Sequence, residues 1–169
     1  MRACAALIAA IAVVLTATGA SATMRISDDV GGRIGAYVDQ FTQVRASGER
    51  VVIDGACLSA CTLVLGIVPR DRICVTRRAT LGFHAAWMPG PHGRRVTSSA
   101  GTQALWEIYP QHVRRWITSR GGLSPKMKFL RGRELAAMYP MCGGEASHRR
   151  ASRGATPHGA VWRASARAR

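Results

Sequence analysis

The stretch "DGACLSACTLVLG", residues 54–66, decides the fold class. It joins a short β-branched strand, "RVVID" (50–54), to the run "SACTLVLGIV" (59–68), which is apolar on nearly all sides and predicts a buried helix. Between them lies the polar turn 57–61, with Ser59 at its centre. A strand that runs through a tight turn into a buried helix is typical of α/β domains.

The flanking sequence extends this alternation of strand and helix. "RIGAYVDQFTQVRASG" (33–48) has apolar residues at helical spacing and ends in Gly48, a fitting C-terminal stop. Further strands are predicted at 24–32, where the strand runs into a Gly-Gly turn, and at 72–76 and 79–87. Strands that alternate with helices predict an α/β fold with parallel strands and crossover helices.

The pattern weakens in the second half. "MPGPHGRRVTSSAG" (88–101) has the Pro, Gly and paired Arg residues of a mobile loop. A helix is predicted over 102–120, with Pro110 as a kink or a restart. After another break, a short helix is expected at 132–139.

The two ends of the chain differ from the domain expected at 23–142. Residues 1–22 combine Arg2, an apolar core and the cleavage site "ASA", as a secretory signal peptide does; an uncleaved membrane anchor is the alternative. Residues 143–169 are rich in Ala, Arg, Gly and Ser and predict a disordered basic tail. We therefore expect an exported protein, periplasmic or secreted.

Export changes the interpretation of the cysteines. Four remain after the signal peptide is removed: Cys57, Cys61, Cys74 and Cys142. An even number in an oxidising compartment indicates disulfides, and three pairings are open. Cys57 and Cys61 are four residues apart and could face each other across one helical turn. No metal is expected, because the spacing is not CxxC and no histidine cluster accompanies it.

The net charge of +15 favours anionic partners, such as lipid headgroups, envelope polymers or nucleic acid. No nucleic-acid-binding motif accompanies the charge, so we expect no nucleic acid partner. Weak contact with an anionic membrane or polymer through the basic tail stays open, and so does an ordinary solvated basic surface.

Three features carry candidate chemistry, and each has a structural alternative. Ser59 opens a buried helix, where free N–H groups can receive an oxyanion; a plain helix cap is the alternative. Gly31 and Gly32 follow a strand and let the backbone approach a ligand, although Gly-Gly is often only a turn. His84 ends an apolar strand and becomes a general base only if it reaches Ser59; otherwise it is a packed histidine.

The order of these features resembles the proteolytic subunit of the Clp protease, within the Clp/crotonase fold. "ISDDVGG" is similar to the family's strand and Gly-Gly segment, "GACLSACTLVLG" to its serine segment, and "RICVTRRATLGFH" to the strand pair that ends in its histidine. The 25-residue separation of Ser59 and His84 agrees with the family spacing. The likeness covers roughly 25–90 well, 120–140 faintly, and points to exported periplasmic relatives with a Cys-x-Ser-Ala-Cys core.

The resemblance implies repeated β-β-α units, a serine peptidase acting on peptides or proteins, and no cofactor. Ser59 would be the nucleophile and His84 the base. An oxyanion hole would form in the Gly31–Gly32 segment, with the N–H groups of Gly32 and Ala60 as donors.

The family's acid has no match, because the stretch "GGLSPKMK" before "FL" lacks a carboxylate. Several alternatives stay open. Glu134 could reach His84 from a shifted frame, or Ser124 or a carbonyl could orient the ring. The site could also work as a Ser-His dyad, or as a Ser-Lys pair with Lys126 or Lys128. A non-catalytic binding or assembly protein of the same fold is the main rival. The loop "MPGPHGRR" (88–95) and the helix after it stand where the family has its assembly handle, but here they are short and basic. We therefore do not assume the family's tetradecameric ring or an ATPase partner, and a homo-oligomer is left open.

Overall fold

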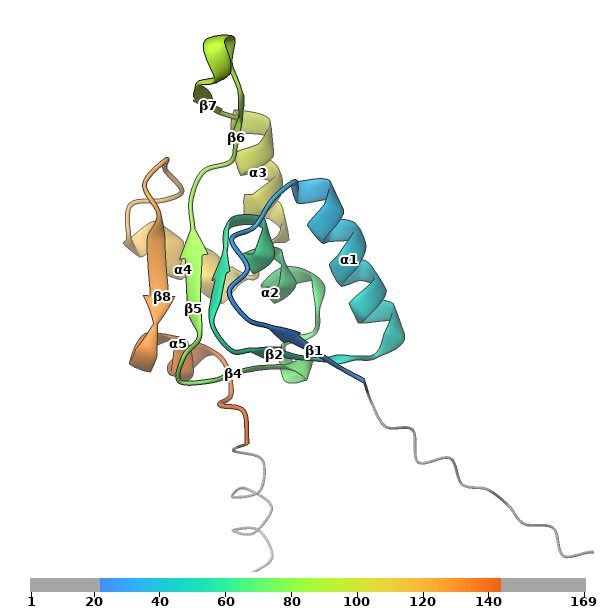
Figure 1. Ribbon diagram of the computed structural model, residues 1–169. Helices are drawn as coiled ribbons and strands as arrows, with labels where there is room; N and C mark the ends of the chain where they lie inside the picture. The colour runs from blue at the N-terminus through green and yellow to red at the C-terminus, as the bar shows by residue number, and fades with distance from the viewer. Residues whose placement is uncertain (1–21, 144–169) are drawn as a thin grey trace, which may run out of the picture.

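Two small sheets form the framework of residues 22–143, the part of the chain that this computed structural model describes (Figure 1). The first sheet is entirely parallel and has the order β1-β2-β4, from the strands β1 (Thr23–Ile26), β2 (Arg50–Ile53) and β4 (Ile73–Val75). The second has the order β3-β5-β8, from β3 (Ala56–Leu58), β5 (Thr80–Phe83) and β8 (Lys128–Arg131). Strands β3 and β5 are parallel and β8 is antiparallel to β5, so the predicted α/β class is confirmed, with one mixed sheet.

Five α-helices of the described residues surround the sheets: α1 (Ile34–Ser47), α2 (Val64–Ile67), α3 (Ser99–Ile108), α4 (Gln111–Ser119) and α5 (Gly132–Met138). Three 3₁₀ turns also occur in the described residues: η1 (Ser59–Leu63) between β3 and α2, η2 (Arg70–Arg72) before β4, and η3 (Pro91–Gly93) after residue 90. Helix α1 ends at Ser47, and Gly48, whose φ is 78°, caps it as the sequence predicts. Pro110 restarts the helix between α3 and α4, because it provides no N–H for a continuous ladder.

Three local predictions need correction. The buried helix expected at 59–68 begins as η1 and has only one α-helical turn, α2. The strand expected at 79–87 stops at Phe83. The loop expected at 88–101 is mostly a β-hairpin, from β6 (Trp87–Pro89) and β7 (Arg95–Thr97), and Ser98 then caps α3 by accepting a hydrogen bond from the Gly101 N–H.

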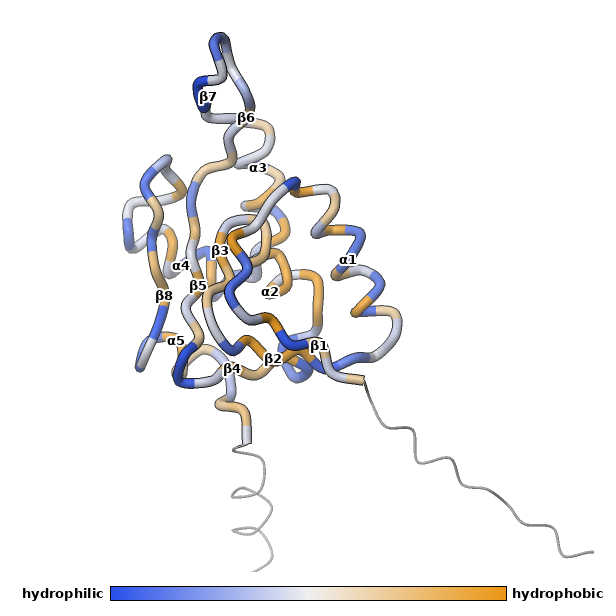
Figure 2. The backbone as a smooth tube through the Cα atoms, viewed as in Figure 1, coloured by the Kyte–Doolittle hydropathy of each residue, from blue (hydrophilic) through white to orange (hydrophobic). Residues whose placement is uncertain are grey.

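The core lies between the two sheets and the helices. Its largest fully buried side chains include Phe41 of α1, Ile53 of β2, Leu63 of η1, Phe83 of β5 and Tyr109 after α3. Phe83 packs edge-on against the Tyr109 ring, which joins the second sheet to the α3–α4 corner. Figure 2 shows that the residues around α2 are largely hydrophobic, while many residues of the outer turns are hydrophilic.

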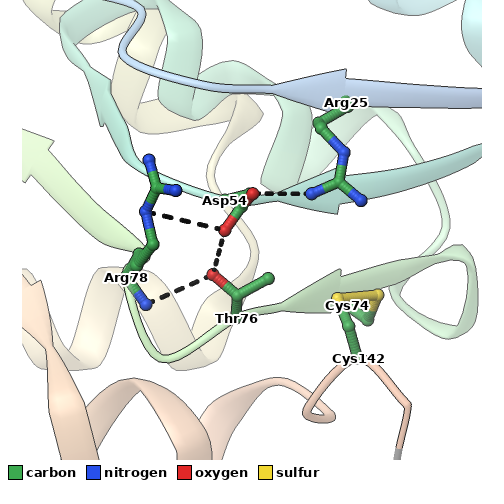
Figure 3. Close-up of polar contacts among 6 residues, drawn as sticks. All are labelled: Arg25, Asp54, Cys74, Thr76, Arg78 and Cys142. Carbon is green, nitrogen blue, oxygen red and sulfur yellow. Dashed lines mark hydrogen bonds and ion pairs between the residues drawn. A yellow bond between two sulfur atoms is a disulfide. The ribbon is translucent and has the colours of Figure 1, made fainter.

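The C-terminal end of the domain is tied to the first sheet (Figure 3). Cys74 of β4 forms a disulfide with Cys142, across a separation of 68 residues. Beside it, the Asp54 carboxylate accepts hydrogen bonds from Thr76 at 2.7 Å and Arg25 at 2.6 Å. The Thr76 hydrogen bond, with smaller contributions from Arg78 and Arg25, holds the pKa of Asp54 below its usual value.

The signal peptide predicted at 1–22 and the basic tail predicted at 143–169 lie outside the described residues, apart from Ala22 and Gly143 at their edges. None of the helices within residues 22–143 is long and apolar enough to cross a membrane.

Candidate active site

Ser59 occupies a constrained turn between β3 and η1. Its φ is 56°, in the left-handed region, which costs a residue with a Cβ roughly 1–2 kcal/mol. A disulfide between Cys57 and Cys61 closes the turn on both sides of Ser59, and both sulfur-bearing residues are fully buried. A serine on a strained turn from a strand into a helix has its hydroxyl presented away from the backbone, as a nucleophile requires.

Two buried hydroxyl groups, those of Thr62 and Tyr109, hold this turn in place. The Thr62 hydroxyl donates to the carbonyl oxygen of Ser59 at 2.6 Å and lies 2.7 Å from the Tyr109 hydroxyl. Because the Thr62 proton is used by Ser59, Tyr109 donates to Thr62. Burial raises the pKa of Tyr109 to about 12, so this donor keeps its proton at neutral pH.

His84 meets Ser59 directly. Its Nε2 lies 2.8 Å from Ser59 Oγ, and its Nδ1 lies 2.6 Å from the Ala85 carbonyl oxygen. A carbonyl only accepts hydrogen bonds, so the proton of the neutral ring sits on Nδ1 and Nε2 accepts from the Ser59 hydroxyl. The parallel pairing of β3 with β5, which sets Leu58 opposite Gly82, brings the two residues together across 25 positions of sequence.

The Gly31–Gly32 segment packs against the same turn. Gly31 has a φ of 82°, and a Cβ there would lie 2.5 Å from the Leu58 carbonyl oxygen and 2.7 Å from the Ser59 Cβ. Only glycine fits this position without displacement of the backbone. The structure therefore places the Gly-Gly segment beside Ser59, where an oxyanion hole would have to be.

Asp29 holds that segment in place. Its Oδ1 accepts hydrogen bonds from the Gly31 N–H at 2.8 Å and from the Tyr37 hydroxyl at 2.6 Å. Burial, followed by the Asp29 carboxylate, raises the pKa of Tyr37 to about 12. Since Asp29 takes the Gly31 N–H, Gly31 shapes the segment, while Gly32 and Ala60 remain the candidate donors to an oxyanion.

Glu134, the carboxylate considered for the third position of a triad, does not join the site. It pairs with Arg120 instead. The β5–β8 register sets Lys128 opposite Phe83, next to His84, and Arg131 opposite Thr80, at the far end of the pair. Helix α5, which carries Glu134, follows that far end.

Ser124 and the two lysines do not orient the His84 ring either. The Ser124 carbonyl accepts from the Ala85 N–H at 2.8 Å, so it holds the backbone after His84 rather than the ring. Lys128 Nζ donates to the Ser124 hydroxyl at 2.8 Å, and Lys126 is exposed. The ring partner is the Ala85 carbonyl, and the contacts describe a Ser-His dyad.

The cysteine pairing is one of the three that the sequence left open, Cys57–Cys61 with Cys74–Cys142. Within residues 22–143, no three His, Cys, Asp or Glu side chains cluster in a way that could hold a metal ion.

Sequence reasoning missed the supporting residues Thr62, Tyr109, Asp29 and Tyr37. A local signal existed for Thr62, because threonine in a helical turn commonly donates to the carbonyl three residues earlier. Tyr109 is 47 positions from Thr62, so no local signal could have paired them.

The assembled geometry can support acyl transfer, because a serine hydroxyl meets an imidazole nitrogen that can accept its proton and the Gly31 backbone packs against the same turn. No protein-family model matches the chain, and a search of curated proteins finds no similar sequence.

Proposed function

We propose that this protein is an exported serine hydrolase of Clp/crotonase type that cleaves peptides through a Ser59-His84 dyad. The observation that carries the proposal is the 2.8 Å contact between Ser59 Oγ and His84 Nε2, made by a serine in a left-handed turn. The Gly31 contact with that turn and the two disulfides add support. Disulfides persist mainly in oxidising compartments, which agrees with export to the periplasm or medium.

The proposed reaction has the following steps. Ser59 Oγ attacks the acyl carbon of a bound peptide while its proton moves to His84 Nε2. The Gly32 and Ala60 N–H groups receive the negative charge of the tetrahedral intermediate. His84 then protonates the leaving amine, and a water activated by the same nitrogen hydrolyses the acyl-enzyme and restores Ser59.

The Ala85 carbonyl fixes the ring orientation but carries no negative charge to stabilise the imidazolium. Replacing the acid of a complete triad with a neutral group costs about 10⁴ in rate. We therefore expect slow turnover, with the rate limited by proton transfer to His84.

A non-catalytic binding protein is the second candidate, favoured by this neutral orienting group. One experiment separates the two functions. The purified protein, Ser59→Ala and His84→Ala are treated with a fluorophosphonate, and the adduct is read by mass spectrometry. We expect labelling of the parent, none in Ser59→Ala and at least about a hundredfold slower labelling in His84→Ala. A folded parent that does not label would leave Ser59 as a helix cap and favour binding.

A further inference from the structure

The hairpin β6–β7 is built unlike the rest of the surface. Figure 1 shows it projecting from the body of the domain, beyond the start of α3. The described residues contain five exposed large hydrophobic side chains, and three of them lie on this hairpin: Trp87, Met88 and Val96. Their exposed fractions are 46%, 52% and 44%, so about half of each apolar side chain faces solvent. A concentration of this kind indicates an interaction surface.

Hydrogen bonds fix the hairpin to the body of the domain, so its exposed apolar side chains have defined positions. The Ala86 N–H donates to Thr102 Oγ1 at 3.0 Å, and the Ser98 N–H donates to the Ala86 carbonyl at 2.8 Å. These bonds fix both ends of the hairpin to the beginning of α3. At the tip, the Gly90 N–H donates to the Arg94 carbonyl at 2.8 Å.

Cationic side chains accompany the apolar ones. Arg94 and Arg95 are exposed, and the Arg95 guanidinium lies 4.5 Å above the Trp87 ring. No Asp or Glu occurs between Asp71 and Glu107, so the sequence around the hairpin carries no acidic residue to neutralise them. An aromatic ring stacked with an arginine combines an apolar body with a phosphate-binding group.

The shape and charge of the hairpin favour a lipid surface over a second copy of this chain as its partner. The hairpin is a projection, and the two surface hollows described, between α3 and α4 and between β4 and α5, are lined by other residues. A projecting hairpin with exposed apolar side chains on its two strands suits a soft surface that it can enter. Tryptophan prefers the boundary between lipid headgroups and acyl chains. A second copy of this chain is disfavoured, because each copy carries a net charge of +15.

We propose that the β6–β7 hairpin binds anionic phospholipid surfaces, with Trp87, Met88 and Val96 entering the interface and Arg94 and Arg95 contacting lipid phosphates. This role is independent of the proposed hydrolase. It also differs from binding through the basic tail, because it uses residues of the folded domain.

The test measures partition of the full chain onto vesicles of phosphatidylcholine alone and vesicles that contain phosphatidylglycerol. We expect binding only to the anionic vesicles, and weaker binding as salt increases. The variant Arg94→Gln/Arg95→Gln is compared with Arg131→Gln/Arg133→Gln, which removes the same charge from exposed positions on β8 and α5. The hairpin variant should bind on the order of tenfold more weakly than its control, because each arginine near the surface contributes attraction of its own.

The variant Trp87→Ser tests the apolar contribution and should weaken binding by about fivefold at unchanged charge. Circular dichroism is used to check that each variant is folded. Equal binding by the two arginine variants, or full binding by Trp87→Ser, would overturn the proposal. Sedimentation velocity addresses the rival occupant: self-association that Trp87→Ser abolishes would assign the hairpin to a contact between copies instead.

Discussion

The backbone of Gly31 lies against Ser59 so closely that a Cβ at position 31 would come within 2.7 Å of the Ser59 Cβ. The two segments are held together by a parallel bridge between Asp29 and Cys57 and by a hydrogen bond from the Leu58 N–H to the Asp29 carbonyl at 2.8 Å. The nucleophile turn and the Gly-Gly segment therefore form one unit, and a change in either should alter the other.

Gly31→Ala should abolish fluorophosphonate labelling of Ser59, because the added methyl group displaces the turn and the φ of 82° is unfavourable for alanine. Gly35→Ala is the matched control. A Cβ at Gly35 meets no atom within 4 Å, and the residue lies in α1, so alanine should label normally and stabilise the domain by up to about 1 kcal/mol. Parental labelling by Gly31→Ala would show that the segment plays no part in the site.

Thr62→Val should destabilise the domain by about 1–3 kcal/mol, because it leaves the buried Tyr109 hydroxyl and the Ser59 carbonyl without their partner. Urea denaturation measures the change, and the labelling rate of Ser59 should fall with it. Thr62→Ser keeps the hydroxyl and should recover most of both. Adding Tyr109→Phe to Thr62→Val should cost less than the sum of the single changes, because the two hydroxyls form one unit. Strict additivity would contradict this coupling.

The two disulfides should affect different properties. Cys74→Ala/Cys142→Ala opens a loop of 68 residues, so we expect a loss of about 2–4 kcal/mol in the free energy of unfolding and nearly normal labelling of the remaining folded protein. Cys57→Ala/Cys61→Ala opens a loop of only four residues but frees the turn that holds Ser59. It should therefore reduce the labelling rate more than the first pair does and cost less stability. The reverse ranking in either measurement would show that the Cys57–Cys61 bond does not position Ser59.

Stability should fall on mild acidification because of His112. Burial, together with the nearby Arg70 and Arg115, lowers the pKa of His112, whose Nε2 lies 3.0 Å from the Tyr139 hydroxyl. The unfolded chain therefore binds a proton first, so the contribution of His112 is complete above about pH 6.5 and is lost as the pH falls below that value.

Urea midpoints near neutral pH and at about pH 5 measure this dependence, and His112→Gln should flatten it. His92→Gln, a change at an exposed hairpin position, is the control and should leave the dependence intact. Asp54 acts in the same direction but at lower pH. Its pKa is lowered, so its contribution is present above about pH 4 and is lost only in stronger acid. A parent whose stability is flat between neutral pH and about pH 5 would contradict the role of His112.

Much of the local structure followed from sequence patterns. The apolar spacing and Gly48 defined α1, the β-branched run at 50–54 defined β2, and Pro110 separated α3 from α4. These features depend on neighbours within one or two turns, which a sequence displays directly. Strand β8 was missed, because its four residues contain only one fully buried position, Leu130, and its pairing partner β5 is distant in sequence.

By itself, the sequence determined the α/β class, the serine at the start of η1 and the glycines that permit close backbone approach. Only the tertiary structure decided which cysteines pair, that Ser59 and His84 touch, that the Ala85 carbonyl orients the ring, and that Glu134 lies with Arg120 instead. The physical reason is the distance along the sequence between the residues that interact. Caps, turns and periodicity are fixed by residues a few positions apart, whereas each contact of the site depends on strand register and packing between segments far apart in the chain.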